Sequence, residues 1–176
     1  MAVSKVTYKL NLNKLGLSEI SNKAEALKEI GEYLKTTILD HAGDLKTTVK
    51  GGAYKKSLSP AYKKFKDDFA SPVPNMELSG DMLDSLDYEY NIASGTVEVG
   101  FFDYDQAQKA DNHNKFTTNA LATDVPARQL IPKNGRDELR PEILQDIKDI
   151  LDDYRDGASG SSGMIMDMIV SNLSRK

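Results

Sequence analysis

The sequence predicts an α/β fold of the α+β kind, in which a small antiparallel β-sheet packs with two long helices and several short helices. Within residues 76–101, leucine and methionine first recur at helical spacing, and apolar residues then alternate with polar ones, as in half-buried strands. The loop Ala93-Ser94-Gly95 separates the two alternating runs and predicts a β-hairpin. Residues 18–41 and 137–154 each carry one apolar stripe, so both are expected to be long helices.

The first half of the chain contributes one further strand and two short helices. Residues 3–12 alternate loosely and predict a strand. Ser59 is a good N-cap and is followed by proline at the first helical position, so a short helix is expected as far as Phe69. Ser79 is expected to cap the short helix that precedes the hairpin.

The segment between the hairpin and the last helix has weaker patterns. Residues 104–112 are compatible with a short helix or a loop, and residues 113–124 have the polar composition of an exposed loop. We therefore expect residues 104–124 to be mobile in the isolated protein and ordered in an assembly. Residues 126–132 predict an edge strand, because a proline at its start cannot donate to a ladder. Pro141 is an alternative start for the last helix.

Apolar positions and composition also predict the core and the domain organisation. Residues 1–155 are expected to form a single α+β domain, followed by a Gly/Ser linker at 156–163 and a flexible apolar C-terminal arm at 164–176. The arm is expected to dock on a neighbouring subunit; folding back on its own last helix and a frayed terminus are the alternatives. The residues expected to form the core are Leu27, Leu34, Leu83, Leu86, Val97, Val99, Ile143 and Ile147.

Composition excludes several classes of function. The chain has no cysteine, which excludes disulfides, thiolate zinc sites and cysteine nucleophiles. It has no run of about 18 apolar residues and no apolar region typical of a signal peptide at its start, so neither membrane insertion nor secretion is expected. The formal net charge of −4 argues against sequence-independent DNA binding by the whole surface.

Candidate catalytic residues lack the partners that catalysis requires. His113 has Asp103 and Asp105 nearby, but no second histidine follows at helical spacing and no calcium-loop glycine is present, so a hydrogen-bonded loop residue is expected. His41 is expected to be a helix C-terminal histidine whose positive charge suits the helix dipole. Ser79 and Ser85 lack the Gly-x-Ser-x-Gly elbow. We expect no enzymatic activity, no metal and no cofactor.

A series of short motifs carries a resemblance to a known family. In order, the motifs are Leu58-Ser59-Pro60-Ala61-Tyr62-Lys63, then Leu78 to Leu86 with Ser79, Gly80, Leu83 and Ser85, then Val97-Glu98-Val99-Gly100, then Tyr104 followed by His113-Asn114, and then Pro126-Ala127-Arg128. Their order and spacing resemble the phage virion morphogenesis and tail-completion family over about Leu58 to Leu151. The stretch from Tyr104 to His113 is longer than is usual in that family.

The resemblance implies a structural protein of the bacteriophage virion. Members sit at the head–tail junction, or neck, of long-tailed phages, so the chain is expected to be made in the host cytoplasm and to act in tail completion. Several copies are expected to assemble as a homo-oligomeric ring between the portal-side head connector proteins and the tail terminator or tail tube proteins. DNA would then pass through the lumen without specific binding.

Candidate contacts in such a ring follow from charge and exposure. Residues 54–66 carry five lysines and no acid, whereas residues 137–156 carry eight acids against three basic residues. We expect neighbouring subunits to place one segment against the other, which is a heterologous contact; two unrelated solvated faces are the alternative. The candidate contact residues are Lys55, Lys56, Lys63, Lys64, Tyr104, His113, Asn114, Asp149, Asp152, Met164, Met166 and Ile169.

A nucleic-acid-binding or packaging accessory module is the alternative function. Its binding segment would be residues 54–66, where Tyr54, Tyr62 and Phe65 interleave with the lysines. Lysines on a solvated helix face are the more common explanation of such a pattern. A salt-dependent gel shift with DNA distinguishes the two functions.

Overall fold

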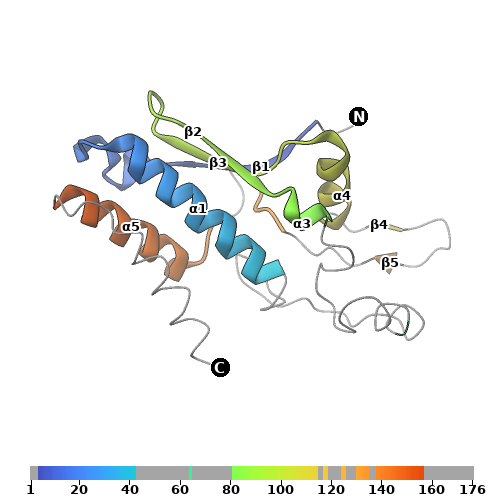
Figure 1. Ribbon diagram of the computed structural model, residues 1–176. Coiled ribbons are helices and arrows are strands. Elements are labelled where there is room, and N and C mark those ends of the chain that lie inside the picture. Colours follow the sequence, from blue (N-terminus) through green and yellow to red (C-terminus); the bar gives the residue numbers. More distant parts are fainter. Residues whose placement is uncertain are drawn as a thin grey trace.

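The computed structural model describes residues 4–42, 64, 81–114, 117–118, 124–125, 130–134 and 138–156. Its centre is a three-stranded antiparallel sheet with the order β1-β3-β2, as Figure 1 shows. The strands are β1 (Val6–Asn11), β2 (Asp87–Asn91) and β3 (Thr96–Phe101). Helices pack with this sheet, so the predicted α+β fold and the predicted hairpin are confirmed.

The pleat of the sheet separates an apolar face from a polar face. Opposite residues in an antiparallel pair share a face, and Val99 lies opposite Tyr8 on β1 and Tyr88 on β2. Val97, Val99 and Phe101 are completely buried. The other set of alternate residues includes Lys9, Glu98 and Glu89, which point away from this core. The central strand is therefore the main apolar contribution of the sheet.

Helix α1 (Lys23–Ala42) covers the apolar face and contacts both β2 and β3. It starts later than the expected Ser18, because the chain first forms two 3₁₀-helices, η1 (Leu12–Leu15) and η2 (Leu17–Glu19). Gly16 joins them with a φ of 103°, a conformation that glycine adopts without strain. Leu12, Leu17 and Ile20 are buried, so these turns close one end of the core.

Gly31 allows α1 to approach the sheet closely. A Cβ atom at this position would lie 2.1 Å from the Tyr88 ring, so only glycine fits beside that ring. The Tyr88 hydroxyl in turn donates to Glu32 of α1 at 2.9 Å. Burial and this carboxylate raise the pKa of Tyr88 to about 12, so the hydroxyl stays protonated and continues to donate.

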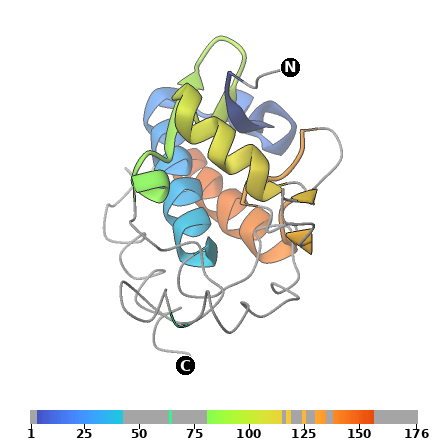
Figure 2. The ribbon, with the colours of Figure 1, turned by 90° about the vertical axis from the view of Figure 1, so that its right-hand side faces the viewer.

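The last helix, α5 (Pro141–Arg155), lies beside α1 in both Figure 1 and Figure 2. It begins at Pro141, which confirms the alternative start and not residue 137, because proline at the first helical position has no N–H group to leave unsatisfied. Two tyrosine hydroxyls join the helices. Tyr33 donates to Asp146 at 2.5 Å, and Tyr154 donates to Glu29 at 2.7 Å.

The short helix before the hairpin is α3 (Asp81–Asp84). Leu83 and Leu86 are both buried, and the Ser85 hydroxyl donates to the Met82 carbonyl at 2.7 Å. Ser85 therefore closes this helix by bonding a backbone carbonyl, which is a structural role. Residues 78–80 lie outside the described residues, and so does the expected cap by Ser79.

Residues 104–114 form the helix α4 (Tyr104–Asn114), which confirms the helical alternative for 104–112 and corrects the expectation of a loop over this part of 104–124. The Asp103 carboxylate caps the helix by accepting from the backbone N–H groups of Asp105 and Gln106 at 3.0 and 3.1 Å. Ala107 and Ala110 are completely buried, and the helix contacts β1, β3 and α3. Small alanine side chains let α4 pack closely, which the polar composition of the segment concealed.

One further expectation concerns the segment before α5. Beyond α4 the chain forms a two-stranded antiparallel pair, β4 (Thr117–Thr118) and β5 (Asp124–Val125). Leu130 and Ile131 are buried and form no strand, so the described part of the expected edge strand 126–132 is instead a packed loop. Its apolar residues fill the core and do not extend the sheet.

The predicted core is confirmed, because all eight residues expected in it are buried. They form one cluster with residues of the first turns, α4 and the loop at 130–131. In the part of the chain that the structure describes, no helix has the length and apolar character needed to cross a membrane.

Candidate interaction surface

The polar face of the sheet and its two outer edges form the candidate interaction surface. On this face Lys9, Asn11, Asp87, Glu89 and Asn91 are exposed, and Glu98 at the centre is partly covered. The alternation of β1, β2 and β3 places these side chains on the face opposite α1, although Asp87 at the start of β2 still reaches Lys35 of α1. Antiparallel sheets commonly keep one face in water, so exposure alone assigns no function. The β1 side and the β2 side of this face differ in their ion pairs and in the hydrogen bonds at their edges.

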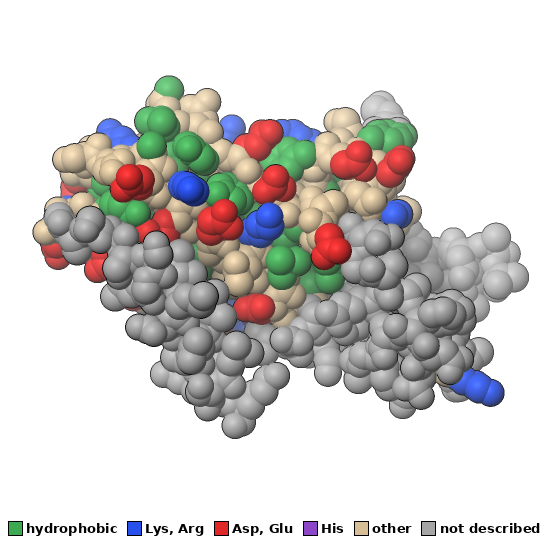
Figure 3. Space-filling view, in the orientation of Figure 1, with side chains coloured by type: hydrophobic (Ala, Val, Ile, Leu, Met, Phe, Trp, Pro, Cys, Tyr) green, Lys and Arg blue, Asp and Glu red, His purple; other side chains and the backbone are tan. Residues whose placement is uncertain are grey.

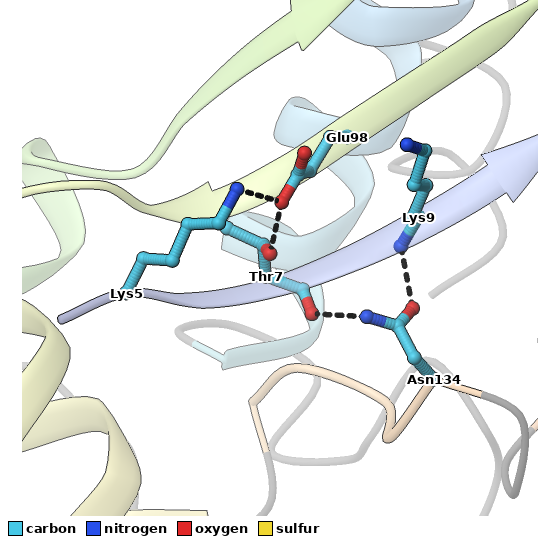
Figure 4. A network of polar contacts seen from close by, with 5 residues as sticks. All are labelled: Lys5, Thr7, Lys9, Glu98 and Asn134. Carbon is cyan, nitrogen blue, oxygen red and sulfur yellow. Dashed lines mark hydrogen bonds and ion pairs between the residues drawn. The ribbon is translucent and has the colours of Figure 1, made fainter. Parts of the chain in front are cut away.

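The carboxylate of Glu98 has two partners, Thr7 on β1 and Lys5 just before that strand. Lys5 Nζ lies 2.6 Å from Glu98 Oε1, and the Thr7 hydroxyl donates to the same oxygen at 2.5 Å, as Figure 4 shows. Burial by itself would raise the pKa of Glu98, but these two contacts outweigh it and hold that pKa below its usual value. Lys5 also lies 5.8 Å from the centre of the Phe102 ring. The β1 side of the face is therefore neutralised within the chain.

Asn134 occupies the outer edge of β1. Its carboxamide accepts from the Lys9 backbone N–H at 2.7 Å and donates to the Thr7 carbonyl at 3.1 Å (Figure 4). These two bonds reproduce those that a neighbouring strand would make. Exposed backbone groups at a sheet edge invite pairing with other chains. Asn134 therefore blocks strand addition at the centre of β1.

The β2 side of the face has a different character. Glu89 lies directly opposite Glu98, and like charges in this position destabilise a strand pair. The described residues provide Glu89 with no ion pair, whereas Asp87 has Lys35 at 3.4 Å. The row across the sheet reads Lys9, Glu98, Glu89, with the positive charge on the β1 side only. The outer side of β2 is therefore acidic.

The structure places the predicted contact residues on separate parts of the molecule. Tyr104 is 51% exposed at the start of α4, and His113 and Asn114 lie in its last turn, so His113 belongs to a helix and not to the expected loop. Lys64 is exposed. Asp149 is half-buried and accepts from Gln145 at 2.7 Å, and Asp152 is exposed and pairs with Arg155. The predicted contact or motif residues outside the described part of the chain are Lys55, Lys56, Lys63, Leu78, Ser79, Gly80, Pro126, Arg128, Met164, Met166 and Ile169.

His41 lies in the last turn of α1, as expected, but the expected positive charge is wrong. The residue is 8% exposed, and burial together with the nearby charge of Arg140 lowers the pKa of His41 to about 4, against a smaller opposing effect of Glu142. The imidazole is neutral at neutral pH. Burial at this end of α1 outweighs the helix dipole.

This shift predicts that acid weakens the fold above the range in which carboxylates titrate. The unfolded chain binds a proton at His41 below about pH 6.5, whereas the folded chain does so only near pH 4, so stability falls between these values as pH decreases. The free energies of unfolding from urea titrations at pH 7 and pH 5, both above the ordinary pKa of Asp and Glu, should differ by about 2 kcal/mol. His41→Gln should flatten this slope, and an unchanged slope would contradict the assignment.

Sequence reasoning missed the acidic edge of β2 and the block of β1 by Asn134. The alternation of Asp87, Glu89 and Asn91 with two tyrosines identified a strand but not its place at the edge, which depends on strand order. Asn134 lies 125 residues from Lys9, so no local pattern connects them. Among the residues that the structure describes, no group of three or more histidine, aspartate or glutamate side chains could hold a metal ion.

Comparison with known proteins gives no assignment. No protein-family model matches the chain, and no curated protein or solved structure matches it significantly.

Proposed function

We propose that this protein is a structural subunit of the head–tail junction of a long-tailed bacteriophage, where it completes the tail as part of a ring. The observation that carries the proposal is the order of its motifs, from Leu58 through the unit at 78–100 to the final helix. The described motifs fall on packed elements. Leu83 and Leu86 are core residues, and Val97 and Val99 form the centre of the sheet. In this proposal the motifs serve packing, and the surfaces around them make the contacts.

The charge distribution suits a ring whose subunits contact one another through unlike surfaces. Helix α5 exposes or half-exposes Asp149, Asp152 and Asp153, while the lysine-rich segment 54–66 includes the exposed Lys64. A heterologous contact between them repeats around a closed ring. Exposed ion pairs contribute about 0.2 to 1 kcal/mol each, so apolar contacts must supply most of the affinity. The proposed role involves no catalysis.

Sedimentation and electron microscopy of the purified protein test the ring directly. At high protein concentration and low salt we expect closed rings, and at high salt smaller species that remain folded. Asp149→Lys should shift the assembly toward monomers, whereas the matched control Asp84→Lys, on the exposed side of α3, should not. A monomer under every condition, or equal effects of the two substitutions, would contradict the proposed contact.

A gel shift separates this role from nucleic-acid binding. A structural ring subunit should leave duplex and single-stranded DNA unshifted at physiological salt. A salt-dependent shift that Lys64→Glu abolishes would favour the accessory DNA-binding module, because lysine contacts to phosphate release counterions and are lost as salt rises.

A further inference from the structure

Strand β2 is an open edge of the sheet, unlike β1. Its hydrogen-bonded partner is β3, and no other described element bonds to its backbone. The opposite edge is occupied by Asn134, whose two bonds satisfy the Lys9 N–H and the Thr7 carbonyl. Among the described residues, the β2 side of the sheet therefore offers backbone N–H and C=O groups to a further strand, whereas Asn134 occupies those at the centre of β1.

Exposed aromatic and aliphatic side chains accompany this edge. Tyr90 on β2 is 43% exposed, and Ile92, the residue after the strand, is 51% exposed. They are two of the three large hydrophobic residues that are exposed among the described residues. In Figure 3 hydrophobic side chains gather along the upper left of the molecule, over β2 and the hairpin tip. Tyr88 lies on the same face and is anchored to α1 by its bond to Glu32.

The polar side of β2 specifies the charge of an added strand. Glu89 faces Glu98 across the strand pair and has no counterion among the described residues. Glu98 already has Lys5 and Thr7 on its other side. A lysine or arginine placed beside Glu89 would give the row a cation on each outer strand, with the two carboxylates Glu98 and Glu89 between them.

We infer that the β2 edge binds an extended segment of a partner protein in which basic residues alternate with apolar ones. The basic residues would lie beside Asp87 and Glu89, and the apolar residues beside Tyr88 and Tyr90. Residues 5–10, which include most of β1, have a similar pattern, with Lys5, Thr7 and Lys9 at one set of alternate positions and Val6, Tyr8 and Leu10 at the other, and β1 pairs with β3 beside Glu98. Strand addition of this kind takes affinity from backbone bonds and specificity from alternate side chains.

A second copy of this chain fits the edge less well. Two β2 strands paired antiparallel about Glu89 would place this carboxylate opposite its own copy, which is repulsive. A register in which Glu89 of each copy lies opposite Asp87 of the other avoids that contact. It still gathers Asp87 and Glu89 of both copies on one short face. The β1 edge of a second copy has the right charge, but Asn134 occupies it.

A synthetic peptide provides the test, using the full-length protein. The probe is acetyl-Lys-Val-Lys-Val-Lys-Val-amide with a fluorescent label, followed by anisotropy and by amide hydrogen exchange of β2. Binding should slow the exchange of alternate β2 amides, those that point away from β3. A peptide with glutamate in place of lysine should bind at least ten-fold more weakly. So should a lysine peptide that is N-methylated at alternate amides, because it keeps the charge but loses backbone donors.

Two charge-reversal variants test whether the peptide binds at the β2 edge or is attracted by the acidic surface as a whole. Glu89→Lys should weaken peptide binding at least ten-fold, while its melting temperature stays equal or rises because the repulsion with Glu98 is removed. Glu138→Lys makes the same charge change at an exposed residue before α5 and should alter binding less than two-fold.

The inference is overturned by any of three results: unchanged exchange of the β2 amides, equal binding of the N-methylated peptide, or equal effects of the two variants. It is also overturned if β2 amides become protected with rising protein concentration and without peptide, because a second copy then occupies the edge. The inference does not depend on the proposed virion role, so its failure leaves the ring experiment unaffected.

Discussion

Replacing Gly100 with alanine is expected to lower the free energy of unfolding by about 3 kcal/mol. Gly100 has a φ of 156°, and a Cβ atom there would lie 2.2 Å from the Val6 carbonyl oxygen and 2.7 Å from the Thr7 Cα atom. Both obstacles are backbone atoms of β1, so no side-chain rotation relieves the contact. Urea unfolding followed by circular dichroism measures the loss as a lower midpoint.

Glu89→Ala is the control for this substitution. Glu89 is exposed on β2, the other neighbour of the same central strand, and its truncation should change stability by less than about 0.5 kcal/mol. If Gly100→Ala unfolded at the same urea concentration as the parent protein, the pairing of β1 with β3 would have to differ from the register described above.

Leu83→Ala is expected to cost about 2 to 5 kcal/mol, because it removes a buried side chain and leaves a cavity. Leu83 is 7% exposed, in the short helix α3 that contacts α4. Tryptophan is absent from the chain, so tyrosine fluorescence or circular dichroism would report unfolding. The m-value should stay constant while the midpoint falls.

The neighbouring residue provides the comparison for Leu83. Asp84 is exposed in the same helix, and Asp84→Ala should change stability by less than about 0.5 kcal/mol. Equal heat stability of Leu83→Ala and the parent protein would show that the unit from α3 to β3 is not held to the core by this side chain. The packing role assigned to the motif at residues 78–86 would then be wrong.

The sequence predicted the core residues correctly where apolar residues recur at a regular spacing along a whole helix or strand. Ile143 and Ile147 on α5, and Val97 and Val99 on β3, were all identified as core residues, since their periodicity reflects one buried face. Strand order was less accessible. The hairpin pairs β2 with β3 locally, but the position of β1 on the far side of β3 depends on contacts about 90 residues apart along the chain.

The errors in the prediction arose where packing used small or isolated residues. Helix α4 buries Ala107 and Ala110, which leave little hydrophobic pattern in a polar segment. Leu130 and Ile131 fall in the segment expected to be an edge strand, yet they fill the core from a loop. His41 was expected to be charged because its position in the helix is visible in sequence, whereas its burial by other elements is not.

The candidate surface was the least predictable part. Charge counts found the lysine-rich and acidic segments, but they treated all acids alike. In the structure Asp146 is bonded by Tyr33 and Asp152 by Arg155, while Glu89 stands opposite another carboxylate. Which acid remains uncompensated depends on cross-strand and interhelical neighbours, and these are set by tertiary structure.

Labelling of virions tests the central claim most directly. In the proposed role the chain is encoded by a long-tailed phage, whose particles would be purified, treated with antibody against the purified protein, and imaged by electron microscopy. The account predicts label at the junction between head and tail, and separate heads and tails when the gene is inactivated. Virions without label, or fully joined and infectious particles made without this protein, would contradict the account.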